Sequence, residues 1–96
     1  MRREDTIRIL VKHRQEFARF GVQSLALFGS VARGEDQPES DVDILVEFEG
    51  RATFDRYMEL RFFLEDLLGC RVDLVTTKAL KSRLRPYIER EAVYVA

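Results

Sequence analysis

The sequence of 96 residues contains one cysteine, two prolines and no tryptophan. A single thiol, Cys70, can neither close an intramolecular disulfide nor build a thiolate metal site, which agrees with a reducing compartment. The longest apolar run, residues 92–96, is far shorter than the ~20 residues needed to span a bilayer, and no apolar segment follows the charged residues at the N-terminus. We therefore expect a cytoplasmic protein with no membrane partner.

An excess of positive charge is also missing. Sixteen lysines and arginines stand against 17 aspartates and glutamates, which gives a formal net charge of −1. Proteins that bind phosphate backbones usually carry a basic surplus, so nucleic acid is not the expected partner. Hydrophobic residues make up 46% of the chain, enough for a packed core, and the length predicts a single domain over residues 1–96.

Hydrophobic periodicity predicts helices that alternate with short strands. The predicted helices are 4–20, 53–68 and 78–92, the last divided by Pro86, and the predicted strands are 24–28, 42–48, 71–76 and 93–95. The polar residues 34–40 include glycine and proline, which is typical of a surface loop. This order predicts an α/β (α+β) domain in which helices flank a small mixed β-sheet.

Two aspartates begin the strand predicted over residues 42–48. Asp41 and Asp43 are separated by one residue, so both carboxylates point to the same side of the strand. Neighbouring carboxylates repel each other unless a cation lies between them, and Mg²⁺ prefers such oxygen ligands. Asp73 follows Val72 as Asp43 follows Val42, and it adds a third carboxylate if the two strands are neighbours. Three such groups suit a two-metal centre for phosphoryl or nucleotidyl transfer.

A glycine turn follows the first predicted strand. Ser30 is expected to be the N-cap of a short helix over residues 30–33, whose free N–H groups would face an anion. Gly29 has no Cβ and would let a triphosphate come close, so Gly29→Val should block the phosphates and leave the fold largely intact. Ten residues separate Ser30 from Asp41, enough to return the chain beside the turn. Phosphate site and metal ligands are therefore expected to converge.

Several of these residues also have an ordinary structural interpretation. An aspartate at a strand start, such as Asp73, can simply be solvated. Arg33 can touch phosphate, although pairing with a carboxylate to fix the loop is the favoured interpretation. Ser40 can cap the turn into the strand or hydrogen-bond to Asp41. The basic residues near the C-terminus form either a solvated face or a contact for an acidic partner or nucleotide; they are Lys78, Lys81, Arg83 and Arg85.

The segments 29–34 and 40–46 together resemble a known signature. Gly-Ser, ten residues and Asp-x-Asp resemble the motif of the DNA polymerase beta-like nucleotidyltransferase superfamily, and the chain is most similar to its minimal nucleotidyltransferases. Residues 72–75 resemble the strand that bears the third carboxylate of that family, so the resemblance covers nearly the whole chain.

The resemblance implies a nucleotidyltransferase fold and a role for each motif residue. Gly29 and Ser30 would hold the phosphates of the nucleotide, and Asp41 and Asp43 would bind Mg²⁺. Asp73 would complete the metal site, with two Mg²⁺ ions expected, and would help to activate the acceptor hydroxyl. ATP is the implied nucleotide donor.

The resemblance also implies a partner. Many minimal nucleotidyltransferases are antitoxins of HEPN-family ribonuclease toxins, and some transfer AMP from ATP to a toxin tyrosine. We therefore expect this chain to transfer AMP to a HEPN-type toxin, or else to neutralise the toxin by steric cover with weak or no catalysis. Larger relatives hold their acceptor with a further domain, so a homo- or hetero-oligomer is expected here. Apolar residues near the C-terminus offer a contact surface: Tyr87, Ile88, Val93, Tyr94 and Val95.

Overall fold

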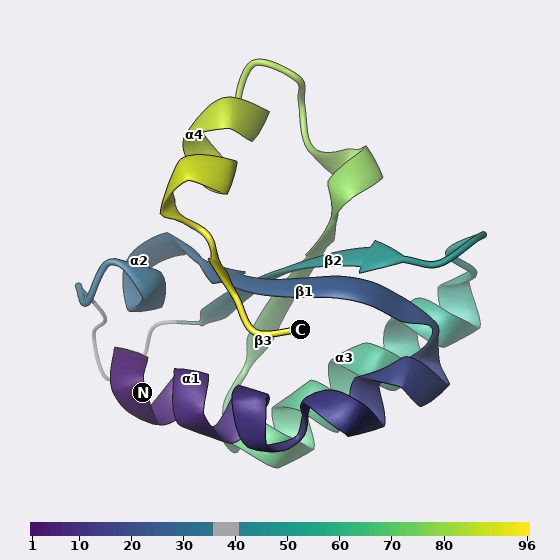
Figure 1. Ribbon diagram of the computed structural model, residues 1–96, viewed down its shortest axis with the longest axis horizontal. Helices are drawn as coiled ribbons and strands as arrows, with labels where there is room; N and C mark the ends of the chain where they lie inside the picture. The colour runs from purple at the N-terminus through teal and green to yellow at the C-terminus, as the bar shows by residue number, and fades with distance from the viewer. Residues whose placement is uncertain (36–40) are drawn as a thin grey trace.

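The computed structural model describes residues 1–35 and 41–96, so most of the predicted loop 34–40 lies outside the described residues. The elements are α1 (Arg3–Lys12), the 3₁₀ helix η1 (Arg14–Phe20), β1 (Val22–Phe28), α2 (Gly29–Ala32), β2 (Val42–Phe48), α3 (Phe54–Leu68), β3 (Val72–Thr76), the 3₁₀ helix η2 (Thr77–Ala79), α4 (Arg85–Glu91) and β4 (Val93–Tyr94). Figure 1 shows their arrangement. Their order confirms the predicted mixed α/β class.

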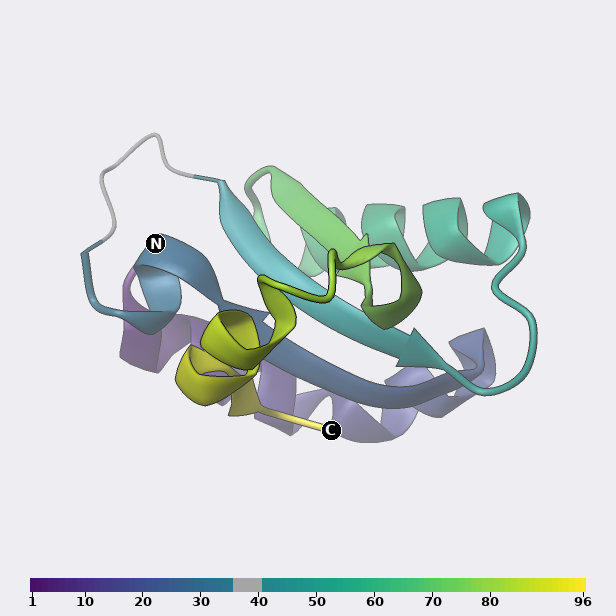
Figure 2. The ribbon, with the colours of Figure 1, turned by 90° about the horizontal axis from the view of Figure 1, so that it is seen from above.

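The four strands among the described residues form one mixed sheet in the order β3-β2-β1-β4. β1 is antiparallel to both β2 and β4, whereas β2 and β3 run parallel. A parallel pair needs a crossover, and α3 supplies it. α1, η1 and α3 lie on one side of the sheet, and α4 with the β3–α4 connection lies on the other (Figures 1 and 2). No helix among residues 1–35 and 41–96 is long and apolar enough to cross a membrane.

The hydrophobic core lies between the sheet and the helices α1, η1 and α3. It contains alternate residues of β2, Val42, Ile44 and Val46, which pack with Leu60 and Leu64 of α3. The intervening residues of β2 project from the opposite face of the sheet. Core packing on one face therefore determines which side chains are available for chemistry on the other.

The predicted N-terminal helix over residues 4–20 is wrong in its second half. α1 ends at Lys12, and residues 14–20 form the tighter helix η1. Side chains three residues apart are eclipsed in a 3₁₀ helix, which places Phe17 and Phe20 on the same side. Both rings pack against Phe63 of α3, with ring centroids 6.0 and 5.0 Å away. Burial of these rings on α3 accounts for the change of helix type.

The predicted helix over residues 78–92 forms two short pieces, as expected, but the break covers residues 80–84 and does not fall at Pro86. Only residues 77–79 and 85–91 are helical, and Pro86 lies in the first turn of α4. Proline lacks an N–H and has a fixed φ, so it suits the start of a helix better than its interior. Pro86 therefore begins a helix and does not divide one. The predicted edge strand is confirmed for Val93 and Tyr94.

We expect Leu64→Ala to lower the free energy of unfolding by about 3 kcal/mol, because it leaves a cavity in the core. Leu64 is 0% exposed, whereas Phe62 on the opposite side of α3 is 57% exposed. Phe62→Ala is therefore the matched control, with an expected change within about 0.5 kcal/mol. Urea unfolding followed by circular dichroism measures both values, and equal losses would contradict this description of the core.

Candidate active site

The carboxylates of Asp43 and Asp73 lie side by side on neighbouring strands. The parallel register pairs Asp43 with Asp73 directly, as the repeated Val-Asp pattern predicted. Burial, and after it the neighbouring Asp73, raise the pKa of Asp43 to about 6; Asp41 adds to this shift and Arg33 opposes it. Like-charged carboxylates at close range disfavour the ionised form of each other. The structure thus brings together two of the three predicted acids.

Asp41 lies immediately before β2 and is exposed. In the part of the chain that the structure describes, no three His, Cys, Asp or Glu side chains are arranged closely enough to hold a metal ion. The donor chemistry nevertheless fits a hard divalent cation, because carboxylate oxygens are its preferred ligands and Asp43 is not fully neutralised by a cation of the protein. The metal site of Asp41, Asp43 and Asp73 stays a prediction.

Gly29 is held against this pair. It follows β1 directly, and its neighbour Phe28 pairs with Asp43 across the sheet. Gly29 has a φ of 75°, and a Cβ at this position would lie 2.1 Å from Oδ2 of Asp43. Any side chain would therefore push the Asp43 carboxylate away. The expectation that Gly29→Val blocks the phosphates and leaves the fold largely intact stays a prediction, and the structure adds that the substitution would also displace a candidate metal ligand.

Ser30 is not the N-cap of the short helix. α2 begins at Gly29, Phe28 occupies the N-cap position, and no side chain of that residue caps the helix. The N–H of Gly29 instead donates a hydrogen bond to Oε1 of Glu91, at 3.1 Å. A carboxylate from α4 therefore satisfies the first amide of the turn, which removes the need for a serine cap. The role of Ser30 in phosphate binding stays a prediction.

Glu91 contacts the candidate site, although the sequence did not predict it as a site residue. Its second oxygen, Oε2, accepts a hydrogen bond from Nη1 of Arg33 at 3.0 Å, and Nε of Arg33 donates to Glu35. The hydrogen bonds that Arg33 donates to Glu35 and, with a smaller effect, to Glu91 raise the pKa of Arg33. This confirms the interpretation of Arg33 as a carboxylate partner. Glu91 and Gly29 are 62 positions apart, so no local motif connects them.

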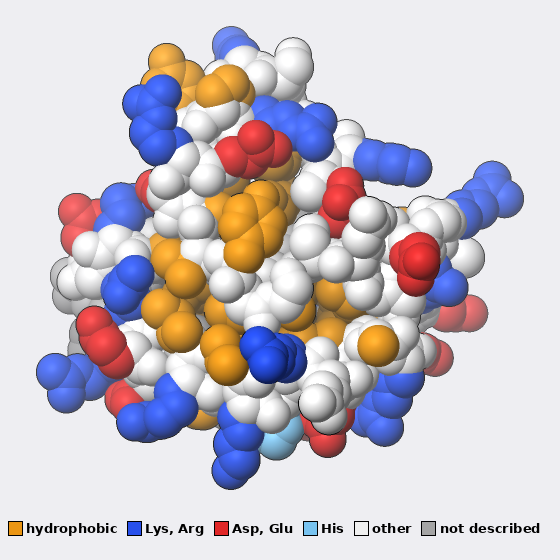
Figure 3. Space-filling view, in the orientation of Figure 1, with side chains coloured by type: hydrophobic (Ala, Val, Ile, Leu, Met, Phe, Trp, Pro, Cys, Tyr) orange, Lys and Arg blue, Asp and Glu red, His pale blue; other side chains and the backbone are white. Residues whose placement is uncertain are grey.

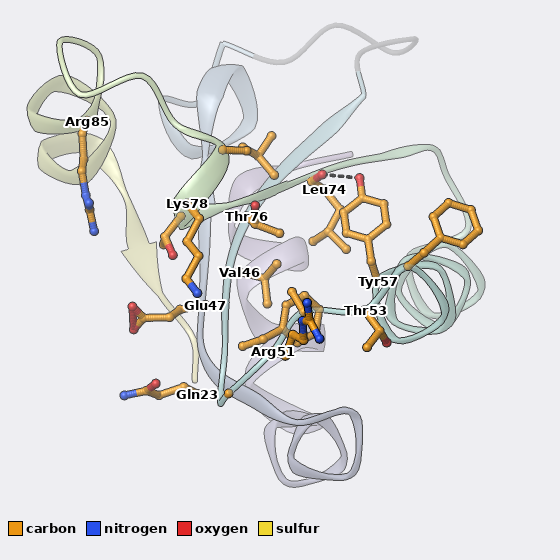
Figure 4. A pocket seen from close by; sticks show the side chains of 17 residues that line it. Gln23, Val46, Glu47, Arg51, Thr53, Tyr57, Leu74, Thr76, Lys78 and Arg85 are labelled. Atoms are coloured by element: carbon orange, nitrogen blue, oxygen red, sulfur yellow. Dashed lines mark hydrogen bonds between the residues drawn. The ribbon is translucent and has the colours of Figure 1, made fainter.

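A pocket lies further along β2 and β3, with a cavity volume of about 1270 Å³. Val75 lines it, and this residue follows Asp73 by two positions, about 7 Å along the strand. Lys78 and Arg85 approach it from the β3–α4 segment and the start of α4, and Glu47 lies near them (Figure 4). Two of the four predicted basic residues therefore border a pocket at the C-terminal ends of β2 and β3, whereas Asp43 and Asp73 lie at the N-terminal ends of these strands.

A hydrogen bond fixes one wall of this pocket. The hydroxyl of Tyr57 on α3 donates to the carbonyl oxygen of Leu74 on β3 (Figure 4). Because this bond joins the helix to the strand that bears Asp73, it holds the wall in a defined position. Asp43 and Asp73 are not among the residues that line this pocket.

The predicted apolar surface near the C-terminus is only partly exposed. Tyr87 and Tyr94 are 67% and 56% exposed, but Val95 is buried with the core. The N–H of Val95 donates to the carbonyl of Leu25, which draws the end of the chain onto β1. Apolar side chains gather between α4 and the sheet on the face seen in Figure 3. The two tyrosines, with Leu84, supply the exposed apolar surface of this region.

Known proteins with similar sequences have the same fold. The nucleotidyltransferase domain family matches residues 10–95, which is most of the chain. The chain belongs to this family, and it is a nucleotidyltransferase by fold and by family.

Particular relatives narrow this class. Protein adenylyltransferase MntA of Thermococcus cleftensis is 47% identical over 93 residues, which cover 96% of this chain and 94% of the relative. A solved structure described as a minimal nucleotidyltransferase has a TM-score of 0.86 and 41% identity, and the match covers 97% of this chain and 95% of that one.

A complex of a tri-AMPylated HEPN toxin from Shewanella oneidensis with an MNT antitoxin contains a chain with a TM-score of 0.66 and 20% identity. The match covers 94% of this chain and 71% of that one. At this identity the similarity shows the fold alone.

We expect Gly29→Ala to be more destabilising than an alanine at another positive-φ glycine. Gly69 has a φ of 68° with no heavy atom within 4 Å of an added Cβ, so Gly69→Ala measures backbone strain alone, roughly 1–2 kcal/mol. Gly29→Ala adds the collision with Asp43 to the same strain. Chemical unfolding of both variants checks this, and losses of the same size would show that Asp43 does not depend on the glycine.

We expect Asp43→Asn to stabilise the metal-free protein at pH 7. Folded Asp43 holds its proton more tightly than the unfolded chain does, so the free energy of unfolding falls as the pH rises from about 4 to about 6 and then stays level. Asparagine does not titrate, so the variant should not lose this part of its free energy of unfolding as the pH rises. Near pH 4 the variant and the parent should therefore be about equally stable. Melting temperatures in EDTA at pH 4, 5 and 7 test this.

The control for this comparison is Asp66→Asn, which replaces an exposed carboxylate on α3. It should follow the pH dependence of the parent. A melting temperature of Asp43→Asn that stays at or below the parent value at pH 7 would contradict the raised pKa of Asp43.

Proposed function

We propose that this protein is a Mg²⁺-dependent adenylyltransferase that transfers AMP from ATP to a hydroxyl, most suitably of a tyrosine, on a HEPN-type toxin, and thereby acts as its antitoxin. The observation that carries the proposal is the pairing of Asp43 with Asp73 beside Gly29. The relative from Thermococcus cleftensis, named a protein adenylyltransferase, supports AMP as the transferred group. The complex with the AMPylated HEPN toxin supports the class of partner.

The proposed reaction assigns a task to each side chain. Asp41, Asp43 and Asp73 would hold Mg²⁺, and Gly29 and Ser30 would bind the triphosphate. When bound, Mg²⁺ supplies neutralisation of charge on the attacking and leaving oxygens. The exposed position of Asp41 leaves it free to turn toward the pair.

The proposed chemistry is a single displacement at phosphorus. The acceptor oxygen forms a bond to the α-phosphorus of ATP, the bond from that phosphorus to the oxygen bridging the β-phosphate breaks, and pyrophosphate leaves. Asp73 accepts the proton of the acceptor hydroxyl. Asp43, held against Gly29, stays beside Asp73 through the step. The pocket along β3 gives room for the chain segment that carries the hydroxyl.

The second candidate is an antitoxin that acts by steric cover alone. The exposed side chains of Tyr87 and Tyr94 favour a contact surface, and both candidates use it. The acidic pair favours the enzyme, because a carboxylate whose pKa is raised to about 6 lowers the stability of the metal-free protein at neutral pH. A subunit that acts only by covering its partner has no use for a pair of carboxylates that lowers its stability.

We expect Asp73→Asn to lower AMP transfer by roughly 10²-fold or more, because it removes the proposed proton acceptor. The protein is co-expressed with the HEPN-type product of a neighbouring gene, purified by size exclusion, and incubated with ATP and Mg²⁺. Intact mass measurement then counts AMP groups on the partner. Asp66→Asn, an exposed change on α3, is the control and should keep the parent rate.

The outcomes separate the two candidates. A stable complex whose partner never gains AMP supports steric cover and overturns the enzyme. A chain that neither binds nor modifies the partner contradicts both.

A further inference from the structure

The end of α4 is joined to the glycine turn by one carboxylate. Glu91 accepts from the N–H of Gly29 through Oε1 and from Arg33 through Oε2, at 3.1 and 3.0 Å. The other ion pairs of α4 remain local: Arg85 pairs with Glu89 four residues away. Among the described side chains of α4, Glu91 is thus the one that hydrogen-bonds to the candidate active site.

The sheet explains why Glu91 reaches this place. β4 begins two residues after Glu91 and pairs with β1 in antiparallel register, Val93 opposite Leu27. In an antiparallel pair, each step back along one strand is a step forward along the other. Glu91 is the last residue of α4 and lies two residues before this pair, while Gly29 lies two residues after it, so the pairing brings the end of α4 beside the turn. The short edge strand therefore delivers the carboxylate to the turn.

Glu91 fixes two groups that surround the acidic pair. Its side chain is 27% exposed, and that of Arg33 is 47% exposed, so the ion pair is partly shielded from water. Arg33 lies near enough to Asp43 to act on its pKa. Gly29 lies directly beside the carboxylate of Asp43, since a Cβ on this glycine would be 2.1 Å from Oδ2. The backbone turn and the guanidinium are therefore held in one relative position by a single anion.

We propose that Glu91 is a positioning residue for nucleotidyl transfer, which holds the turn at Gly29 and the side chain of Arg33 in the arrangement that receives the nucleotide triphosphate. This inference rests on the proposed function, in which the turn binds the phosphates. An isolated ion pair on a protein surface contributes little to stability. The pairing with a backbone amide beside Asp43 gives Glu91 its importance for the site.

Two substitutions separate the contacts of Glu91. Glu91→Ala removes both hydrogen bonds. Glu91→Gln keeps one amide oxygen that can accept from Gly29, but its NH₂ group cannot accept from Arg33. The glutamine variant should therefore keep the hydrogen bond to the N–H of Gly29 and lose the one to Arg33. Glu89→Ala is the matched control, because Glu89 lies on the same helix and pairs only with Arg85 among the described contacts.

The first measurement is nucleotide binding. Calorimetry with the ATP analogue AMP-PNP and Mg²⁺ should show that Glu91→Ala weakens binding by about tenfold or more, the scale typical of residues that orient a site. Glu91→Gln should give a smaller loss, and Glu89→Ala should stay within about twofold of the parent. In the transfer reaction, KM for ATP should rise more than kcat falls, since the chemical groups themselves remain.

The second measurement needs no nucleotide. Amide hydrogen exchange by NMR should show faster exchange at Gly29 in Glu91→Ala and near-parent exchange in Glu91→Gln. If the parent protein does not bind AMP-PNP, the proposed function fails. If amide exchange at Gly29 is unchanged in Glu91→Ala, the hydrogen bond between Gly29 and Glu91 is overturned, whatever the result with AMP-PNP.

A folded Glu91→Ala variant that binds AMP-PNP as tightly as the parent overturns the proposal, and so does a loss of the same size in Glu89→Ala. Circular dichroism establishes the fold of each variant. Should Glu91→Ala not fold, Glu91→Gln is compared with Glu89→Gln by the same criteria: a larger loss supports the positioning role, and an equal loss overturns it.

Discussion

The parallel register between β2 and β3 is the constraint on which the site depends. Ile44 and Leu74 are paired in this register and buried in the core, so the neighbouring residues of each strand must point to the other face. A slip by one residue would expose the apolar set to water. The free energy of core burial therefore forces Asp43 and Asp73 together despite their repulsion. The raised pKa of Asp43 reports the electrostatic cost of this arrangement.

Three segments far apart in the chain meet around Asp43. β1 brings Gly29, whose missing Cβ leaves space for the carboxylate, and β3 brings Asp73. α4 and β4 bring Glu91, which ties the turn to the C-terminal region. Each contact comes from a strand pairing. The sheet thus positions the two aspartates, the glycine turn and Glu91 relative to one another.

The sheet also leaves surface near the site that other elements of the chain do not cover. The exposed Tyr87 and Tyr94 belong to α4 and β4, and the pocket beside Val75 lies at the C-terminal ends of β2 and β3. An acceptor carried by a second protein can approach carboxylates that are already aligned. This division between a packed face and an open face is consistent with an enzyme whose substrate is presented by a partner, as proposed above.

The sequence by itself determined the local features whose causes lie within a few residues. Alternation along a strand placed Asp43 and Asp73 on the face opposite the core, and the helix predicted over residues 53–68 matches α3 to within one residue. It did not predict the 3₁₀ helix at Arg14–Phe20, because the rings there turn toward Phe63, a residue of another helix. Only the tertiary structure assigned the helix cap to Glu91 instead of Ser30, since strand pairing between β1 and β4 joins residues that are 62 positions apart and share no sequence pattern.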